Sequence, residues 1–316
     1  MKIKILDSAS LGEDTPLEIL ERFGDLEIYS ATDEATIYDR CADADVIVIN
    51  KVKITEKVIK STKALKLVCV FATGFDNVDI NAARECGVAV CNVPGYSTDS
   101  VALYTAATVL SFCTHLIEYR DFVVKGEYSV SGAPNRLIPV YHELRGKTWG
   151  IVGYGNIGKA VARIADAFGA RVIVCKREPT RERECVDIDT LCRESDIITL
   201  HCPLNDGTMQ LINEKRISLM KNNVILVNEA RGAVLDEAAV ADAVKKGKIA
   251  AFGCDVYSKE PFDAVHPYNE IKQLQNVILT PHAAWGAYEA RVRCINTIAQ
   301  NIDSFNSGKF LNRVDI

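Results

Sequence analysis

Short runs of β-branched and other apolar residues recur along the first third of the chain, separated by segments of helical character. They cover Lys2 to Leu6, Leu26 to Ser30, Val46 to Asn50, Leu65 to Ala72 and Val88 to Val93. Nearly continuous apolar strands that alternate with helices are typical of a parallel sheet covered on both faces. The pattern therefore predicts a first parallel sheet in this part of the chain.

A second series of apolar runs begins at Trp149. It continues through Arg171 to Cys175, Ile197 to Cys202, Val224 to Asn228, Ile249 to Val256 and Asn276 to Leu279. The same argument predicts a second parallel sheet, so the fold class is α/β with two doubly wound domains.

Two helical segments connect these series. The segment from about Thr98 to Arg120 is rich in Ala, Leu, Val and Thr, and Ser97 or Ser100 could cap its start. The segment from Trp285 to Lys309 has apolar residues at helical spacing. We expect this last helix to return to the first domain, which would make that domain discontinuous. The predicted domains are 1–98 with 285–316 and, inserted between these, 99–284, with a cleft between them.

A glycine-rich loop follows the strand that begins at Trp149 and precedes a helix predicted from Lys159 to Phe168. Its residues are Gly153, Tyr154, Gly155, Asn156, Ile157 and Gly158. In a strand, turn and helix of this kind, glycines allow a tight turn, close approach of a pyrophosphate and helix packing, and the helix N-terminus attracts the anion. The loop predicts dinucleotide binding; a turn without a nucleotide is the alternative.

The next strand ends at Cys175 and is followed by Lys176 and Arg177 rather than by an acidic residue. A carboxylate at this place accepts hydrogen bonds from the adenosine ribose, whereas a Lys-Arg pair attracts a ribose 2′-phosphate. We therefore expect NADP. In the alternative, both basic side chains are solvated and Glu178, or a shifted backbone, serves NAD.

Three residues with catalytic potential each follow an apolar run in the second series: Arg231, Glu260 and His282. Ligands bind at the strand ends of open α/β sheets. A guanidinium suits carboxylate binding, and an imidazole with a nearby carboxylate suits proton transfer. Each residue alone could instead be a surface ion-pair partner, a loop residue or a helix cap.

Composition excludes several other classes of protein. The net charge of −5 and the pI near 5.7 argue against a nucleic-acid surface, which needs an excess of Lys and Arg. The N-terminus does not read as a signal peptide, and no apolar run reaches the roughly 18 residues of a membrane span. We expect a cytoplasmic protein with no membrane partner.

The eleven cysteines form no Cys-x-x-Cys pair, and several lie in apolar runs. We expect reduced, mostly buried thiols and no metal site. Cys185 and Cys192 flank an acidic stretch and are expected to be partly exposed.

The chain resembles the D-isomer-specific 2-hydroxyacid dehydrogenase family over essentially its whole length. Besides the glycine loop, the matching motifs occur in the family's order; they are Ala72 to Asp79, Asn92 to Gly95, His201 to Leu204, Met220-Lys221, Asn228 to Gly232 and Gly253 to Val256. The resemblance implies a flavodoxin-like substrate domain and an inserted Rossmann domain that binds NAD(P).

The resemblance also implies roles for residues. Arg231 would bind the substrate carboxylate and polarise the keto oxygen, His282 would donate the proton, and Glu260 would orient the imidazole and favour its charged form. Thr73 and Gly74 would bind the carboxylate through backbone amides, and Lys51 would add charge or be merely solvated. The cofactor groove would include Cys202, Pro203, Thr208, Glu229 and Ala230, with Asp255 at the nicotinamide carboxamide.

Two departures from the family pattern stand out. Many members have Val-Ala-Glu where this chain has Val101-Ala102-Leu103, and the ribose-binding acid is absent at Lys176.

The stretch from His282 to Trp285 is similar to the glycerate dehydrogenase and hydroxypyruvate reductase branch. Trp285 would limit the substrate to a small acid such as hydroxypyruvate or glyoxylate, or it would be an interdomain packing residue.

Several alternatives stay open. The D-lactate type is one, and the D-3-phosphoglycerate type is less favoured because no regulatory tail follows Ile316. A dinucleotide-sensing binding protein of the same fold is another. The segment from about Asp121 to Arg145 resembles the family's dimerisation arm, so we expect a homodimer.

Overall fold

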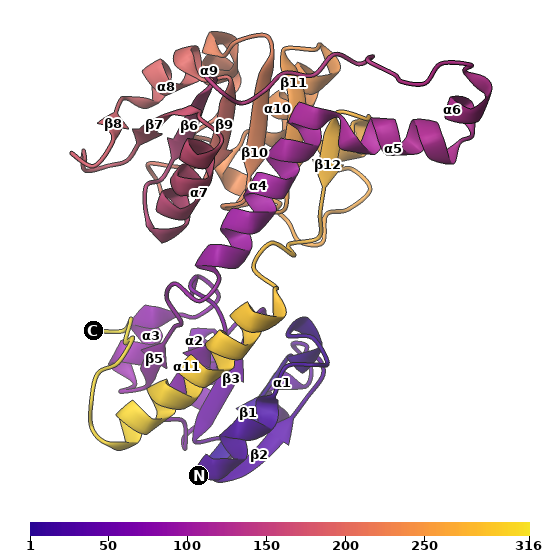
Figure 1. The fold of residues 1–316 in the computed structure, drawn as a ribbon. Helices are drawn as coiled ribbons and strands as arrows, with labels where there is room; N and C mark the ends of the chain where they lie inside the picture. The colour runs from indigo at the N-terminus through magenta and orange to yellow at the C-terminus, as the bar shows by residue number, and fades with distance from the viewer. The chain divides into compact units, whose positions relative to one another are not determined.

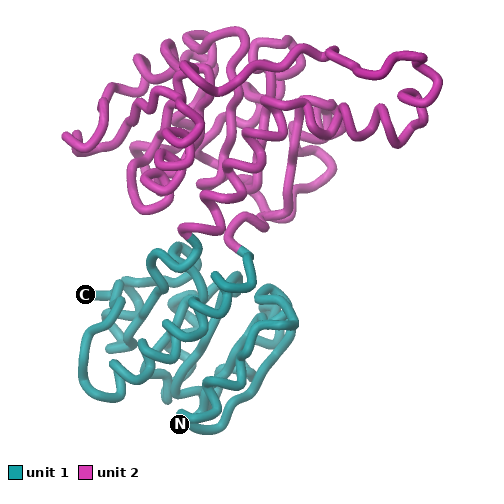
Figure 2. The backbone as a smooth tube through the Cα atoms, viewed as in Figure 1, with its two compact units in different colours: residues 1–97, 286–316 teal, residues 98–285 magenta.

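The computed structural model describes residues 1–316, and the chain separates into two compact units. Unit 1 comprises residues 1–97 and 286–316, and unit 2 comprises residues 98–285 (Figure 2). These divisions lie one residue before and one residue after the predicted ones.

Unit 1 is built on a parallel sheet of five strands in the order β2-β1-β3-β4-β5 (Figure 1). The strands are β1 (Lys2–Ile5), β2 (Asp25–Ile28), β3 (Val46–Ile49), β4 (Leu67–Val70) and β5 (Ala89–Cys91). The helices are η1 (Ser8–Ser10), η2 (Leu17–Phe23), α1 (Ile37–Cys41), α2 (Glu56–Ser61), α3 (Ile80–Glu85) and α11 (Tyr288–Asn306). β3 and β4 are buried along their whole length, as central strands of a covered parallel sheet should be.

Helix α11 comes from the end of the chain and packs on β4 and η2. Its fully buried residues Ala290, Cys294, Ile295, Ile298 and Ile302 recur at helical spacing, so one apolar face covers the sheet. The helix begins at Tyr288, later than the predicted start at Trp285.

Unit 2 is built on a parallel sheet of seven strands in the order β12-β11-β10-β9-β6-β7-β8 (Figure 1). The strands are β6 (Thr148–Val152), β7 (Arg171–Cys175), β8 (Glu184–Cys185), β9 (Ile197–Leu200), β10 (Val224–Asn228), β11 (Ile249–Cys254) and β12 (Val277–Leu279). The order reverses between β6 and β9, and such a switch point is where open α/β sheets bind ligands. The predicted fold class, α/β with two parallel sheets, is confirmed.

Helices cover both faces of this second sheet. The helices of unit 2 are α4 (Thr98–Thr114), α5 (Leu116–Val124), α6 (Glu127–Val130), α7 (Asn156–Ala167), α8 (Ile188–Glu194), α9 (Glu214–Leu219), η3 (Gly232–Val234), α10 (Glu237–Lys245) and η4 (Pro267–Glu270). α4 and α7 bury residues in the core on one face, and α8, α9 and α10 bury residues in the core on the other face. The sheet is thereby shielded from water except at its edges.

Three sequence predictions of secondary structure were wrong in detail. The single helix expected from Thr98 to Arg120 is two helices, because His115 adopts a left-handed conformation (φ 50°) and ends α4. Helix α7 begins at Asn156 rather than Lys159, so the end of the glycine loop forms its first turn. The two-residue strand β8 was missed, because Glu184–Cys185 has no apolar run.

No single helix is long and apolar enough to cross a membrane; by length and composition alone, α4 and α5 pass that test only as a pair, bent by 63°.

Candidate active site

The candidate residues of unit 2 lie in the loops that follow its strands. Gly153 follows β6, Cys202 follows β9, Arg231 follows β10, Glu260 follows β11 and His282 follows β12. Because all seven strands are parallel, their carboxyl ends meet at one edge of the sheet. Residues spread over 130 positions of sequence are therefore collected at the same edge.

Glu260 and His282 are in direct contact. The Glu260 Oε2 atom lies 2.6 Å from Nδ1 of His282, and Oε1 accepts a hydrogen bond of 3.0 Å from the backbone N–H of Tyr257. The carboxylate thus holds the imidazole through Nδ1 and is itself fixed by the backbone. This geometry directs Nε2 of His282 to any proton exchange with a ligand.

The backbone at His282 has a positive φ of 53°, which is uncommon for a residue with a side chain. Its N–H donates to the Asp255 carbonyl at 2.8 Å. The buried Asp255 carboxylate accepts from Thr280 Oγ1 at 2.6 Å and from the N–H groups of Ala283 and Ala284 at 2.8 and 2.9 Å. Together these hydrogen bonds hold the backbone of the turn in its strained conformation, and the turn in turn positions the imidazole.

The loop that carries Arg231 is fixed by the buried Asn228. The Asn228 side chain accepts from Ala230 N and donates to the Arg231 carbonyl, both at 3.0 Å. The next residue, Gly232, packs so tightly that an added Cβ would lie 2.1 Å from the Ser258 nitrogen. The Arg231 loop therefore contacts the same segment that holds Glu260.

The glycine loop has two glycines that packing requires and one that it does not. Gly153 has a φ of +94°, and a Cβ there would lie 2.6 Å from the Cys202 nitrogen; a Cβ at Gly158 would lie 2.1 Å from the Gly153 carbonyl oxygen. A Cβ at Gly155 would meet nothing within 4 Å. Gly155 is also the N-cap of α7 and provides no side-chain cap. Open space beside an uncapped helix N-terminus fits the pyrophosphate of a dinucleotide.

Other residues predicted for the cofactor groove lie at neighbouring strand ends. Lys176 and Arg177 are exposed after β7. The hydroxyl of Thr208 donates to the Pro203 carbonyl at 2.6 Å, which closes the loop after Cys202. Both basic side chains are thus available to a phosphate, whereas Thr208 organises its own loop.

Glu229 is buried, and its Oε2 atom has no hydrogen-bond partner. His201 is half-buried, but both of its ring nitrogens are buried and have no hydrogen-bond partner. Burial, with a contribution from the nearby Asp255 carboxylate, raises the pKa of Glu229 to about 9. Burial lowers the pKa of His201 to about 3. At neutral pH both side chains are therefore uncharged.

The candidate residues of unit 1 also follow strands. Lys51 follows β3, and its N–H donates to Oδ2 of Asp7 at 2.5 Å. Asp7 also accepts from the N–H groups of Asn50 and Val52 at 3.0 Å. The Thr73 hydroxyl donates to the Val93 carbonyl at 2.8 Å, and the Thr73 carbonyl accepts from Asn92 Nδ2 at 2.7 Å. Gly74 follows directly, and Trp285 ends unit 2.

All eleven cysteines are free thiols. Cys192 is fully buried in α8, so the expectation that it is partly exposed was wrong; the apolar face of α8 turns it toward the core. Burial raises the pKa of Cys192 to about 12 and that of Cys202 to about 11, so neither thiol is reactive at neutral pH. No group of His, Cys, Asp and Glu side chains is arranged to hold a metal ion.

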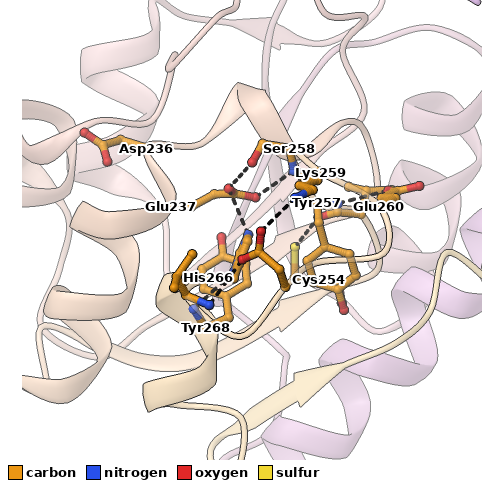
Figure 3. A network of polar contacts seen from close by, with 12 residues as sticks. Asp236, Glu237, Cys254, Tyr257, Ser258, Lys259, Glu260, His266 and Tyr268 are labelled. Carbon is orange, nitrogen blue, oxygen red and sulfur yellow. Dashed lines mark hydrogen bonds and ion pairs between the residues drawn. The ribbon is translucent and has the colours of Figure 1, made fainter.

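The sequence argument missed Asp7, Glu237 and His266. The side chains of Asp7 and Glu237 bind loops that carry candidate residues and are distant from these loops in sequence, and His266 binds Glu237. Glu237 and His266 are connected to Glu260 through the Tyr257–Ser258 segment, as Figure 3 shows.

Comparison with known proteins identifies relatives across the whole chain. The family model for the D-isomer specific 2-hydroxyacid dehydrogenase NAD binding domain matches residues 106–284. The chain is 36% identical to a hydroxypyruvate reductase of Blautia hydrogenotrophica, with all of both chains covered. It is 35% identical to a glyoxylate reductase of Thermococcus litoralis, covering 98% of this chain and 95% of the relative.

Among solved structures, an acyclic imino acid reductase in complex with NADPH and D-Arg is similar, with a TM-score of 0.89 and 30% identity over 99% of this chain and all of that one. A full-length match at these identities shows common descent as well as a common fold. The chain therefore belongs to the D-isomer-specific 2-hydroxyacid dehydrogenase family, in the branch of the hydroxypyruvate and glyoxylate reductases, and is an oxidoreductase that uses a nicotinamide dinucleotide.

Proposed function

We propose that the protein reduces hydroxypyruvate or glyoxylate to the corresponding 2-hydroxy acid, which for hydroxypyruvate is D-glycerate. The observation that carries the proposal is the 2.6 Å contact between Glu260 and His282, beside the loop that carries Arg231. A keto acid needs a cation for its carboxylate and an acid for its ketone oxygen, and these three residues supply both.

Arg231 is proposed to bind the substrate carboxylate and to polarise the keto oxygen. A guanidinium is planar and always charged, so it can bind a carboxylate with two parallel hydrogen bonds. The packing of Gly232 on Tyr257 and Ser258 fixes the backbone from which this side chain extends.

His282 is proposed to donate the proton to the keto oxygen from Nε2, because Nδ1 faces Glu260. The ionised Glu260 favours the charged imidazole and orients it, which is what a general acid needs. In the reverse direction, the same nitrogen takes the proton back.

The cofactor is proposed to lie along the carboxyl edge of unit 2, with its pyrophosphate at Gly155 and the N-terminus of α7. When bound, it supplies or accepts the hydride. Cys202, Pro203, Thr208, Glu229, Ala230 and Asp255 are the other residues proposed to hold it. We propose NADP, because the exposed Lys176 and Arg177 follow β7 and can bind a 2′-phosphate. The similar imino acid reductase was solved with NADPH, which supports this choice.

Unit 1 is proposed to be the substrate domain and unit 2 the dinucleotide domain. Thr73 and Gly74 would bind the substrate carboxylate through backbone N–H groups, with Lys51 adding positive charge. Trp285 would restrict the substrate to a small acid. The names of the two curated relatives agree with a substrate of two or three carbons.

A homodimer is proposed from the surface of the segment that contains α5, α6 and residues 131–145. Figure 1 shows α5 and α6 extending from the body of unit 2. Apolar side chains are exposed along this arm: Val123, Val124, Tyr128, Val130, Leu137, Ile138, Val140 and Tyr141. An apolar patch of this extent usually marks an interface. Light scattering should give twice the chain mass; a monomer would contradict the proposal.

The activity is tested by the loss of nicotinamide absorbance with NADPH or NADH and with hydroxypyruvate, glyoxylate, pyruvate or 3-phosphohydroxypyruvate. Rapid oxidation of NADPH with either of the first two acids is expected. Preference for pyruvate or the phosphorylated acid would indicate the D-lactate or phosphoglycerate type instead. Cofactor binding without turnover of any acid would favour a sensor.

The cofactor preference has its own test. Replacing Lys176 and Arg177 together by alanine should weaken NADPH binding about tenfold or more and change NADH binding little, because only the 2′-phosphate is lost as a partner. Equal loss for both cofactors would contradict the proposed role of the pair.

A further inference from the structure

The segment Tyr257–Ser258 lies at the centre of the site, although neither side chain belongs to the catalytic set. Tyr257 donates its N–H to Glu260 at 3.0 Å and its hydroxyl to the Thr280 carbonyl at 2.7 Å, two residues before His282. Gly232, next to Arg231, packs against the backbone of both residues. The position of this segment therefore affects all three catalytic residues.

This segment is held by the carboxylate of Glu237, the first residue of α10 (Figure 3). Oε1 accepts from the Ser258 N–H at 2.9 Å, and Oε2 accepts from the Ser258 hydroxyl. Oε2 also accepts from Nε2 of His266 at 3.1 Å. Only 9% of the Glu237 side chain is exposed, so the carboxylate itself is largely removed from water.

The tautomer of His266 is fixed by its other nitrogen. Nδ1 accepts from the N–H of Tyr268 at 3.2 Å, so the proton of a neutral ring is on Nε2 and points to Glu237. The ring also packs on Phe262, with centroids 4.8 Å apart, and Phe262 packs on Tyr257 at 4.7 Å. The Glu237 carboxylate thus has three hydrogen-bond donors, and one of them, His266, packs against Phe262.

We propose that Glu237 is a positioning residue of the catalytic site. Its carboxylate holds the Tyr257–Ser258 segment, and the Tyr257 N–H in turn sets the orientation of Glu260 and so of His282. The inference rests on the proposed roles of Glu260 and His282. A carboxylate–imidazole pair at 2.6 Å loses much of its effect when the carboxylate turns away, so the outer hydrogen bonds matter for proton transfer.

A purely structural role for Glu237 is the competing explanation. An acidic residue in the first turn of a helix stabilises the helix through its dipole. Glu214 is the matched control, since it is also the first residue of a helix after a capping residue, but it is exposed. Glu214→Gln reproduces the loss of charge without the loop contacts.

The experiment follows the imidazole directly. Full-length protein labelled with ¹⁵N-histidine and free of cofactor is examined by NMR at one fixed pH, and the signal of each ring nitrogen is recorded. The protein contains five histidines, and a His282→Gln variant assigns the signals of His282. The variants are Glu237→Ala, Glu237→Gln, Ser258→Ala, Glu214→Gln and, as a reference, Glu260→Gln. Steady-state kinetics with hydroxypyruvate and melting curves are measured on the same preparations.

We expect Glu237→Ala to move the Nδ1 signal of His282 toward its position in Glu260→Gln, because the contact between Nδ1 and Glu260 is weakened. It should lower kcat about tenfold with a much smaller change in KM, because the acid is misplaced while Arg231 still binds substrate. Glu237→Gln should have a smaller effect, since its oxygen still accepts from Ser258 N–H while its amide opposes His266. Glu214→Gln should match the unmodified protein.

The inference is overturned if folded Glu237→Ala keeps the His282 Nδ1 signal and the kcat of Glu214→Gln, even with a lower melting temperature. If Glu237→Ala does not fold, unchanged His282 Nδ1 signals and unchanged kcat in both Glu237→Gln and Ser258→Ala overturn it equally. If Glu260→Gln changes neither the His282 signal nor kcat, the proposed roles of Glu260 and His282 are wrong, and this inference is wrong with them. If Glu260→Gln changes the His282 signal and kcat but the Glu237 variants change neither, only the inference about Glu237 is overturned.

Discussion

Two carboxyl groups of unit 2, the largely buried Glu237 and the buried Glu229, have opposite hydrogen-bonding surroundings. Glu237 accepts hydrogen bonds from the Ser258 N–H, the Ser258 hydroxyl and His266. Glu229 has no partner for Oε2, and its pKa rises to about 9. The two histidines nearby differ in the same way: His266 uses both ring nitrogens, whereas neither ring nitrogen of His201 has a partner.

The difference follows from what each side chain can reach. Glu237 begins a helix and faces a loop whose backbone offers donors. At the end of β10, Asn228 pairs with Leu200 of β9 on one side and with Cys254 of β11 on the other. The next residue, Glu229, therefore lies between His201, which follows Leu200, and Asp255, which follows Cys254. The oxygens of Asp255 already accept three hydrogen bonds, and a second carboxylate beside them is disfavoured.

The comparison shows that burial alone does not decide the state of a carboxyl group. With donors present, burial strengthens the hydrogen bonds and fixes a loop; without them, it keeps the group protonated and costs stability. The hydrogen bonds of Glu237 thus hold the Tyr257–Ser258 segment, whereas Glu229 and His201 leave buried polar atoms without partners at the proposed cofactor edge.

The largest effect is expected at His282, which contacts Glu260. His282→Gln should lower kcat about 10³-fold, because glutamine cannot exchange the proton. Fluorescence titration should show that NADPH still binds with nearly unchanged affinity. A loss of activity of less than tenfold would show that another group is the acid.

Next in size, Glu229→Gln should stabilise the cofactor-free protein by about 3 kcal/mol at pH 7. The folded pKa of about 9 lies above the ordinary 4.5, so the folded state binds more protons and stability falls as pH rises between these values. Urea unfolding at pH 5, 7 and 8 should show that the variant lacks this decline. Glu214→Gln, at an exposed position, should behave like the unmodified protein. An unchanged pH dependence in Glu229→Gln would mean that Glu229 is ionised.

A smaller effect is expected at His201. The folded pKa of about 3 lies below the ordinary 6.5, so stability is lost as pH falls below 6.5 and the unfolded chain takes up a proton. His201→Leu should reduce the stability lost between pH 7 and pH 5 by about 2 kcal/mol. The exposed His142→Ala is the control. If both variants lose as much stability as the unmodified protein over that range, His201 does not carry the acid sensitivity.

The smallest effect tests a satisfied pair in the same sheet. The buried Trp149 donates its indole N–H to Thr199 Oγ1 at 3.1 Å. Thr199→Val keeps the shape but leaves the N–H unpaired, and should destabilise the protein by roughly 1.5 kcal/mol with no dependence on pH. Urea unfolding measures this loss; a neutral result would show that the pair, unlike the Glu237 network, contributes little.

Local sequence pattern predicted most of the fold. The apolar runs that became β1, β3, β4, β6, β7, β9, β10 and β11 are continuous enough to be recognised alone, and the glycine loop was found by the spacing of its three glycines. The motifs from Ala72 to Val256 indicated the family, and comparison with known proteins confirmed it.

The places where sequence failed share one physical cause. Neither the bend at His115 nor the pairing of Glu184–Cys185 with β7 is marked by a periodic pattern of apolar residues. Each depends on the surrounding structure rather than on the propensity of the residues, so no local pattern reveals it.

The sequence by itself determined the two parallel sheets, the glycine loop and the order of Arg231, Glu260 and His282, because apolar periodicity and short motifs are written along neighbouring residues. Only the tertiary structure decided that Glu237 has three donors and that Glu229 Oε2 has none. The charge of a buried group depends on donors brought from loops and strands some 20 to 30 residues away, and these distances close only when the sheet forms.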